Sequence, residues 1–425
     1  MKKPSANQEI KPLQQKLVDR LLETGRIQSA AVEAAFRAVP RHLFLPGFDL
    51  GRVYSDVAIP TKQLADGQAI SSSSQPAMMA IMLEQLDLKP GQRVLEIGAG
   101  SGYNAALLAH LVGPSGSVIT VDIDPEIVVG ARQHLDAAGF ERVQTICGDG
   151  IAGLSVGAPF ACIILTVGTW DIAPAWVEQL QEGGKLVLPL ALGQYGEQSV
   201  AFVKRDGRLI SQSIESCGFM KLRGSLAAKS DFAIIPLGPE PGLILACPTG
   251  QVIDPDLVYH WLSGPAQDWD TGLEISRWES RPFGLTPWLR RFNGCTLRSF
   301  GPLADSPLVP HFAVKPGEWR FTSGVIGEQG VCLTMVSPDQ PLALEAFHKG
   351  HRFRLYFRSY GPDQQLPRQL LAAIRDWDAA GRPKYKIERI QVFPPGAVFK
   401  LLPHQVPLAK RWTTLVLDLT YLPNN

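Results

Sequence analysis

The sequence predicts an α/β fold with a doubly wound parallel sheet, followed by a second domain of α+β type. Three observations lead to this prediction. Short apolar runs alternate with helical stretches between residues 93 and 190, a glycine-rich turn follows the first of these runs, and the composition changes beyond about residue 226. Alternation at this spacing is typical of βαβ units, whose right-handed crossovers cover both faces of a parallel sheet.

Three helices are expected before the sheet. Apolar residues at helical spacing predict the first over residues 13–23, and the second, over residues 29–38, is ended by Pro40. Ser74 followed two residues later by Pro76 is a helix start signal, because proline is tolerated in the first turn. We expect the third helix to begin there.

The sheet is predicted from five short apolar runs, each followed by a helical stretch or a turn signal. The expected strands cover residues 94–97, 118–122, 143–146, 160–166 and 185–190, and the expected helices cover residues 104–111, 125–138 and 173–181. Two further strand-like runs at 198–204 and 208–214 are separated by Asp206 and Gly207, a turn signal. They are expected to form a hairpin that closes the sheet.

The chain beyond about residue 226 has a different composition. Prolines become frequent and most of the tryptophans lie there. One helix is predicted over residues 367–380, and strand-like runs occur at 353–357 and 414–418. We therefore predict two domains, residues 1–225 with the parallel sheet and residues 226–425 with an α+β fold.

The composition argues against several classes of function. The 425 residues include 41 basic and 40 acidic residues, so no excess of positive charge indicates a nucleic-acid partner. The six cysteines are scattered without CxxC spacing, which predicts free thiols in a reducing compartment and no metal site. No apolar run approaches the roughly 20 residues of a spanning helix. We expect a soluble, cytoplasmic protein with no membrane partner.

The glycine-rich turn after the first strand predicts a cofactor site. Gly98, Gly100 and Gly102 follow the strand and precede a helix, so backbone N–H groups can approach a ligand closely. A dinucleotide fingerprint would place its third glycine at position 103, which is Tyr103. Glu96, two residues before the first glycine, instead favours a cationic ligand. The pattern predicts a Rossmann-like sheet that binds S-adenosylmethionine.

Two further acidic residues follow the next strands. Asp122 ends the second strand, where a carboxylate can accept both ribose hydroxyls. Asp124 competes for this role, but its place before Pro125 favours a helix cap. Asp149 and Gly150 follow the third strand, and Asp149 is expected to accept from the adenine amino group, with a simple turn aspartate as the other interpretation.

Residues 11–222 resemble the protein-L-isoaspartate O-methyltransferases. The segment ahead of the glycine turn is the specific part of the resemblance, since methyltransferases in general lack it. The matching residues are Val39-Pro40-Arg41-His42-Leu43-Phe44-Leu45-Pro46, Tyr54-Ser55-Asp56, Ser74-Gln75-Pro76, Gly102-Tyr103, Gly148-Asp149-Gly150 and Gly183-Gly184-Lys185-Leu186-Val187-Leu188-Pro189.

The resemblance implies transfer of a methyl group to a carboxylate of a peptide or protein, with a serine that orients this carboxylate. The chain departs from the family at this position, because it has three additional serines before Pro76. Alignment from Ile70 selects Ser71, whereas alignment from Pro76 selects Ser74. Both are candidate catalytic residues, ahead of the two serines between them.

The second half of the chain extends beyond the usual end of the family. It resembles the isoaspartyl-type methyltransferases associated with lanthipeptides, the FxLD-type group. The residues that carry this resemblance are Ile172-Ala173-Pro174-Ala175-Trp176, Cys217-Gly218-Phe219, Gly361-Pro362-Asp363 and Ile374-Arg375-Asp376-Trp377-Asp378. This resemblance implies an aspartate or isoaspartate of a precursor peptide as the acceptor. We expect the second domain to recognise substrate, or else to cover the sheet or mediate assembly.

Other interpretations remain at this stage. The same first half is compatible with a methyltransferase for small molecules or nucleic acids, and with an inactive cofactor-binding assembly protein. Trp170, after the fourth strand, is expected either to line the acceptor pocket or to pack beneath the second domain. The intact acidic residues and glycines favour an active enzyme. The sequence does not indicate the oligomeric state.

Overall fold

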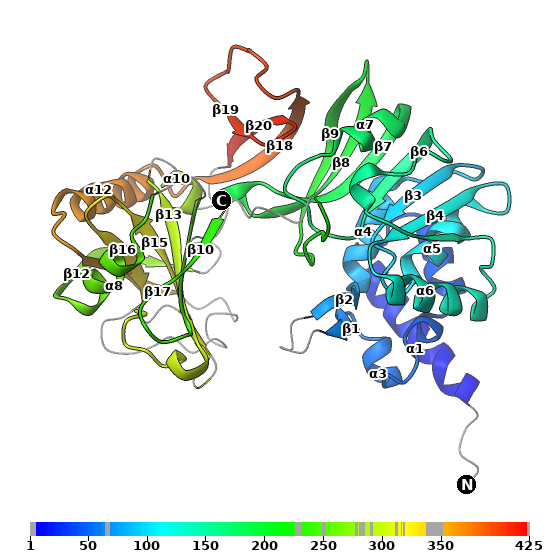
Figure 1. Ribbon diagram of the computed structural model, residues 1–425, viewed down its shortest axis with the longest axis horizontal. Helices are drawn as coiled ribbons and strands as arrows, with labels where there is room; N and C mark the ends of the chain where they lie inside the picture. Colours follow the sequence, from blue (N-terminus) through cyan, green and yellow to red (C-terminus); the bar gives the residue numbers. More distant parts are fainter. Residues whose placement is uncertain are drawn as a thin grey trace, which may run out of the picture. The chain divides into compact units, whose positions relative to one another are not determined.

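The computed structural model describes residues 6–63, 69–225, 232–248, 252–276, 279, 285–289, 292–310, 313–315, 317, 319–336 and 352–422. These residues form two compact units (Figure 1). The first contains residues up to 192, 197–228 and 387–418, and the second contains residues 193–196, 229–386 and the end of the chain.

The first unit is built on a ten-stranded sheet. Its strand order is β19-β20-β18-β9-β8-β7-β6-β3-β4-β5. The strands from β7 to β5 in this order are parallel, and β8 and β9 are antiparallel to their neighbours. The bounds are β3 (Arg93–Ile97), β4 (Ser117–Asp122), β5 (Gln144–Cys147), β6 (Phe160–Leu165), β7 (Leu180–Ala191), β8 (Glu197–Arg205) and β9 (Arg208–Ser216). The predicted doubly wound α/β fold is confirmed, and the predicted hairpin is β8 and β9, but it does not close the sheet, because β18 pairs with β9.

Helices cover this sheet because they present apolar faces to it (Figure 1). Helix α5 (Tyr103–Val112) is almost entirely buried, and Asp124 caps α6 (Pro125–Ala137) by accepting from the N–H groups of the first turn. The predicted cap role of Asp124 is confirmed. The remaining helices are α1 (Ala6–Glu23), α2 (Ala30–Ala38), α3 (Leu50–Val53), α4 (Pro76–Leu86), α7 (Pro174–Gln179), and the short 3-10 turns η1 (Arg41–Phe44) and η2 (Gly150–Ala152).

A small antiparallel ribbon precedes α4. It pairs β1 (Ile59–Gln63) with β2 (Ala69–Ser73), so the serine run belongs to a strand and to the residue after it. The sequence predicted no strand here. A run of four serines has little β propensity, and pairing with β1 gives it an extended conformation.

The chain returns to the first unit near its end. Strands β18 (Lys384–Phe393), β20 (Thr414–Leu422) and β19 (Gln405–Ala409) extend the sheet beyond β9. The buried carboxylate of Asp171 accepts from Thr413 Oγ1 at 2.6 Å and from the Trp412 N–H at 2.7 Å. The sequence analysis placed all residues after 225 in the second domain and did not predict this return, because the sequence of a strand does not indicate which strand it pairs with.

The second unit, taken by itself, is an antiparallel sheet with helices. Its strand order is β10-β11-β13-β15-β16-β17-β12, with β14 also paired to β15. Trp377 on α12 is fully buried in its core. The bounds are β10 (Phe232–Pro236), β11 (Leu243–Pro248), α8 (Pro255–Ser263), β12 (Ala266–Ile275), α10 (Leu285–Trp288), β13 (Gly294–Phe300), β14 (Ala313–Lys315), β15 (Trp319–Ile326), β16 (Val331–Met335), β17 (Phe353–Tyr360) and α12 (Gln365–Ala379).

Among the described helices, none combines the length and apolar character needed to span a bilayer. Within the same ranges, no group of three or more histidine, cysteine or acidic side chains is arranged to hold a metal ion.

Candidate active site

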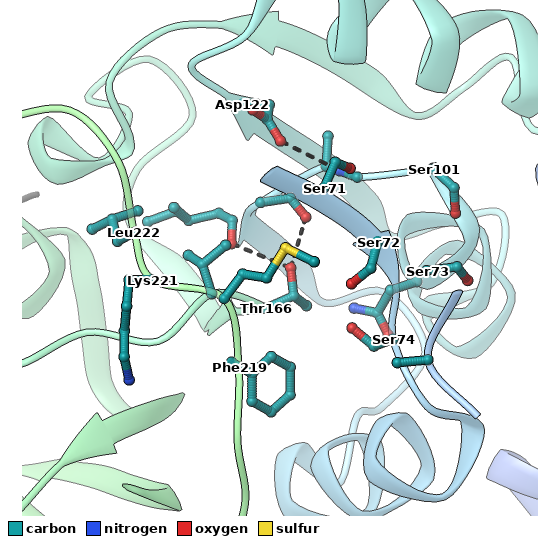
Figure 2. Close-up of a pocket in the computed structure, with 18 of the residues that line it drawn as sticks. Ser71, Ser72, Ser73, Ser74, Ser101, Asp122, Thr166, Phe219, Lys221 and Leu222 are labelled. Carbon is teal, nitrogen blue, oxygen red and sulfur yellow. Dashed lines mark hydrogen bonds between the residues drawn. The ribbon is translucent and has the colours of Figure 1, made fainter. Parts of the chain in front are cut away.

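A cavity of about 400 Å³ lies at the carboxyl ends of β3 and β4 (Figure 2). Ligands of open α/β sheets bind at this edge. Four parts of the first unit form its walls: the serine run, the glycine turn, the residues after β4 and β6, and the segment after β9. The lining residues used below are Ser71, Ser72, Ser73, Ser74, Gly98, Gly100, Tyr103, Asn104, Asp122, Gly150, Thr166, Phe219, Lys221 and Arg223.

The glycine turn forms the floor of one side of the cavity. Gly98 has a φ of 105°, and a Cβ at this position would lie 2.6 Å from Thr166 Oγ1. Gly100 has a φ of 51°, and its Cβ would lie 3.4 Å from the carbonyl oxygen of Ser72. The turn therefore requires glycine for two reasons, its left-handed backbone and the close approach of neighbouring residues.

Glu96 lies beneath the turn and does not line the cavity. Its fully buried carboxylate accepts from Thr120 Oγ1 at 2.7 Å and from Asn104 Nδ2 at 2.8 Å. Burial raises the pKa of Glu96 to about 7, although these two hydrogen bonds oppose the shift. The sequence argument placed Glu96 near the cationic ligand, whereas the structure gives it a role in holding β3, β4 and α5 together under the glycine turn.

Asp122 lies at the cavity wall, as its place at the end of β4 predicted. Its carboxylate (Figure 2) accepts from the N–H of Gly100 at 3.4 Å and from the N–H of Asp124 at 3.2 Å. Burial raises the pKa of Asp122 despite these donors. Arg223 approaches within 3.7 Å of the same carboxylate. Asp122 is thus an acceptor-rich group directed at the cavity.

Asp149 is occupied by protein donors. Its Oδ2 accepts from the N–H of Ser225 at 2.8 Å and from its hydroxyl at 2.5 Å, and its Oδ1 accepts from the N–H of Ile151. Burial raises the pKa of Asp149, but these hydrogen bonds outweigh that effect and hold the pKa below its usual value. Asp149 itself does not line the cavity, whereas Gly150 does. The adenine role of Asp149 stays a prediction.

All four serines of the run line the opposite wall, but their hydroxyls have different surroundings. Ser71 Oγ accepts from Thr61 Oγ1 at 2.9 Å, and Ser73 Oγ accepts from Arg41 at 3.3 Å. The hydroxyls of Ser72 and Ser74 make none of the hydrogen bonds found among the described residues. In Figure 2 they lie between Ser73 and the wall that carries Thr166 and Phe219. Successive side chains of a strand point to opposite faces, which explains why Ser71 and Ser73 share one environment and Ser72 and Ser74 another.

The segment after β9 forms a wall that the sequence analysis did not assign to the site. Gly168 and the segment exchange backbone hydrogen bonds, from Gly168 N–H to the Met220 carbonyl at 2.7 Å and from Leu222 N–H to the Gly168 carbonyl at 2.8 Å. Glu197 accepts from the Phe219 N–H at 2.7 Å and pairs with Lys221. The Cys217-Gly218-Phe219 motif was the only available signal. Trp170 is not among the residues that line the cavity.

The arrangement fits an S-adenosylmethionine cofactor. Gly98 and Gly100 line the cavity beside Asp122, a carboxylate suited to vicinal hydroxyls, so the backbone of the turn can approach a ligand closely. Fold and cavity together define the class of S-adenosylmethionine-dependent methyltransferases.

Comparison with known proteins gives the family. A family model for protein-L-isoaspartate(D-aspartate) O-methyltransferase matches residues 12–227, and the chain belongs to this family. The protein-L-isoaspartate O-methyltransferase of Methanopyrus kandleri is 41% identical over 211 residues, covering 49% of this chain and 91% of the relative. That of Hyperthermus butylicus is 41% identical over 218 residues, covering 49% and 88%.

A solved structure of a protein-L-isoaspartate O-methyltransferase is also similar. It shares 23% identity and a TM-score of 0.47, and the match covers 87% of this chain and 92% of that chain. The family predicted from the motifs of the first half is therefore confirmed by sequence, and the chain is an S-adenosylmethionine-dependent methyltransferase. The expected range of the resemblance, residues 11–222, agrees with the matched range.

Proposed function

We propose that this protein methylates a carboxylate of an isoaspartyl or aspartyl residue in a peptide or protein. The product is a methyl ester, which a neighbouring backbone nitrogen can attack to give a succinimide. The observation that carries the proposal is one cavity with two different walls. The glycine turn and Asp122 suit the cofactor, and the other wall carries the hydroxyls of Ser72 and Ser74, which make no hydrogen bond to the described residues.

The reaction requires little from the protein beyond the positioning of the acceptor carboxylate and the methyl donor. A carboxylate is ionised at neutral pH, so the acceptor needs no general base. When bound, S-adenosylmethionine supplies a methyl group activated by a positively charged sulfur. The residues of this chain have to hold the acceptor in line and exclude water, and such positioning can supply most of a rate enhancement. Glu197 neutralises Lys221 at the cavity wall, which limits competition for the acceptor carboxylate.

Ser72 and Ser74 are the proposed orienting groups. A hydroxyl can donate to a carboxylate without neutralising it. Ser74 was selected by alignment from Pro76, and the free hydroxyl of Ser72 adds a second donor at the same wall. Ser71, selected by the other alignment, is only 6% exposed and its oxygen accepts from Thr61 Oγ1, whereas its own proton stays free to donate. We assign it a supporting role because of its burial, and it is the comparison residue for this wall.

The test compares matched acceptors. The full-length protein is incubated with methyl-labelled cofactor and with two peptides of the same sequence, one isoaspartyl and one aspartyl at the same position. We expect label in the isoaspartyl peptide as an ester that is released at alkaline pH. Label that resists alkali would contradict carboxyl methylation, and transfer to small molecules alone would support the small-molecule alternative.

We further propose that residues 226–425 contribute acceptor selectivity, as the resemblance to the FxLD-type group implies. The residues behind that resemblance have structural roles in the second unit: Asp363 accepts from the first N–H groups of α12, and Trp377 is core. They therefore support a shared fold more directly than a shared substrate. Comparison of kcat/KM for a precursor peptide and for random isoaspartyl peptides tests the idea. Equal values would contradict it.

A further inference from the structure

Arg41 is a buried arginine behind the serine wall of the cavity. Its side chain is 0% exposed, and it begins the short turn η1. Burial is the main cause of a lowered pKa for Arg41, but a guanidinium stays protonated at neutral pH. The protein therefore holds a full positive charge in a low-dielectric place, which is costly unless something compensates it.

The described residues do not compensate this charge fully. The carboxylate of Asp56 acts on Arg41 only from beyond ion-pair distance, no other described carboxylate lies within that distance, and the Nε and Nη1 atoms of Arg41 have no hydrogen-bond partner. Only Nη2 is bonded, to the carbonyl oxygens of Ser74 at 3.0 Å and Val57 at 3.4 Å and to Ser73 Oγ at 3.3 Å. Buried arginines usually have a carboxylate partner, because the cost of an unpaired charge is large.

The contacts of Arg41 are with the cavity wall itself. Ser73, Ser74 and Tyr103 all line the cavity, and the guanidinium lies 5.7 Å from the centre of the Tyr103 ring. Because Ser73 Oγ accepts from Arg41, the hydroxyl proton of Ser73 is free to point elsewhere. The positive charge thus lies one layer behind the hydroxyls that face the cavity.

We propose that Arg41 is a positioning residue that makes the serine wall selective for an anionic acceptor. The inference rests on the proposed carboxyl methylation. A carboxylate in the cavity supplies the missing negative charge, while the serines between them keep Arg41 from forming a direct ion pair that would tie up the attacking oxygen. The planar fork of arginine also fixes Ser73 and Ser74 at once, which a lysine does less well.

The test measures binding, not turnover. Protein loaded with S-adenosylhomocysteine is titrated by calorimetry with an isoaspartyl peptide and with the same peptide carrying the α-amide in place of the carboxylate. We expect the wild type to prefer the carboxylate. In Arg41→Met this preference should fall roughly tenfold, because a charge close by in a poorly screened site is removed, while affinity for S-adenosylhomocysteine changes less than about threefold. An unchanged preference in the variant would overturn the inference.

Two controls separate charge from folding. Arg37→Met removes a nearby surface arginine that pairs with Asp19 and Glu33, and should leave the preference unchanged. Arg41→Lys should restore most of the preference for the carboxylate peptide. A preference in Arg41→Lys as low as in Arg41→Met would count against the charge effect. If Arg41→Met does not fold, the same titration is made with Arg41→Gln, which keeps a donor for the carbonyl oxygen of Ser74. A wild type without any preference would instead reject the proposed function.

Discussion

The two walls of the cavity were built in different ways. On the proposed cofactor side, the backbone makes the surface: Gly98 and Gly100 have left-handed φ values, and Asp122 ends a strand within the same βαβ unit. On the proposed acceptor side, side chains from distant parts of the sequence meet, including Arg41, the serine run and Phe219. The first wall is local and dictated by steric fit, whereas the second depends on tertiary packing.

The difference has a consequence for mutation. A side chain added to a glycine of the turn strains a left-handed backbone, and removal of the Asp122 carboxylate deletes a charged acceptor, so changes on this side should reduce binding sharply. A change on the acceptor side removes one of several donors, and its neighbours can partly replace it. Three variants test this contrast, and Glu96→Gln tests the buried support beneath the glycine turn. They are given in order, beginning with the largest expected effect.

Gly98→Val should nearly abolish cofactor binding. Its Cβ would lie 2.6 Å from Thr166 Oγ1 and the backbone φ of 105° disfavours any side chain. Overpacking of this kind costs about 1–3 kcal/mol, which the turn can relieve by shifting; because the cofactor needs the unshifted turn, affinity should fall by up to roughly 100-fold. Calorimetry with S-adenosylhomocysteine checks this. Gly148→Ala is the matched control, since no atom lies within 4 Å of a Cβ there and its φ is not positive. Equal affinities in both variants would contradict the role of Gly98.

Asp122→Ala should weaken cofactor binding by about 2 kcal/mol, or roughly 30-fold, because hydrogen bonds to a charged acceptor are lost. The same titration measures it. Asp124→Asn serves as the control, since asparagine retains the cap of α6 and Asp124 is not among the cavity-lining residues. A larger loss in Asp124→Asn than in Asp122→Ala would reverse the assignment of these two carboxylates.

Glu96→Gln should change how stability depends on pH. The pKa of Glu96 is raised from 4.5 to about 7, so the folded state binds its proton more tightly than the unfolded state does. The stabilisation is complete below pH 4.5 and is lost as pH rises through 7, by about 2 kcal/mol between pH 5 and pH 7. Denaturant unfolding at several pH values should show a flatter profile for Glu96→Gln. Parallel profiles would mean that Glu96 titrates normally.

The double variant Ser72→Ala, Ser74→Ala should lower kcat/KM for an isoaspartyl peptide about tenfold, because a hydrogen bond to a charged group contributes about 1.5 kcal/mol or more. Cofactor affinity should stay the same, since neither hydroxyl is hydrogen-bonded to the glycine turn or to Asp122. Ser71→Ala is the comparison, and we expect a smaller effect there. If Ser71→Ala is the more damaging, the alignment from Ile70 identifies the functional serine.

Much of the first unit could be predicted from local patterns. Apolar runs of strand length, the start signal at Pro76 and the cap at Asp124 all correspond to elements of the structure. The ribbon of β1 and β2 was missed because polar strands lack an apolar alternation. The return of residues 387–418 to the first sheet was missed because the contact of Asp171 with Thr413 spans 242 residues.

The sequence by itself determined the fold class, the family and the place of the glycine turn, because each follows from spacing within a few tens of residues. Only the tertiary structure decided that Glu96 lies buried under the turn, outside the residues that line the cavity, and that Asp149 is held by Ser225. It also placed a buried guanidinium behind the serines. A side chain takes its protonation and its partners from whatever packs around it, and distant segments supply those neighbours.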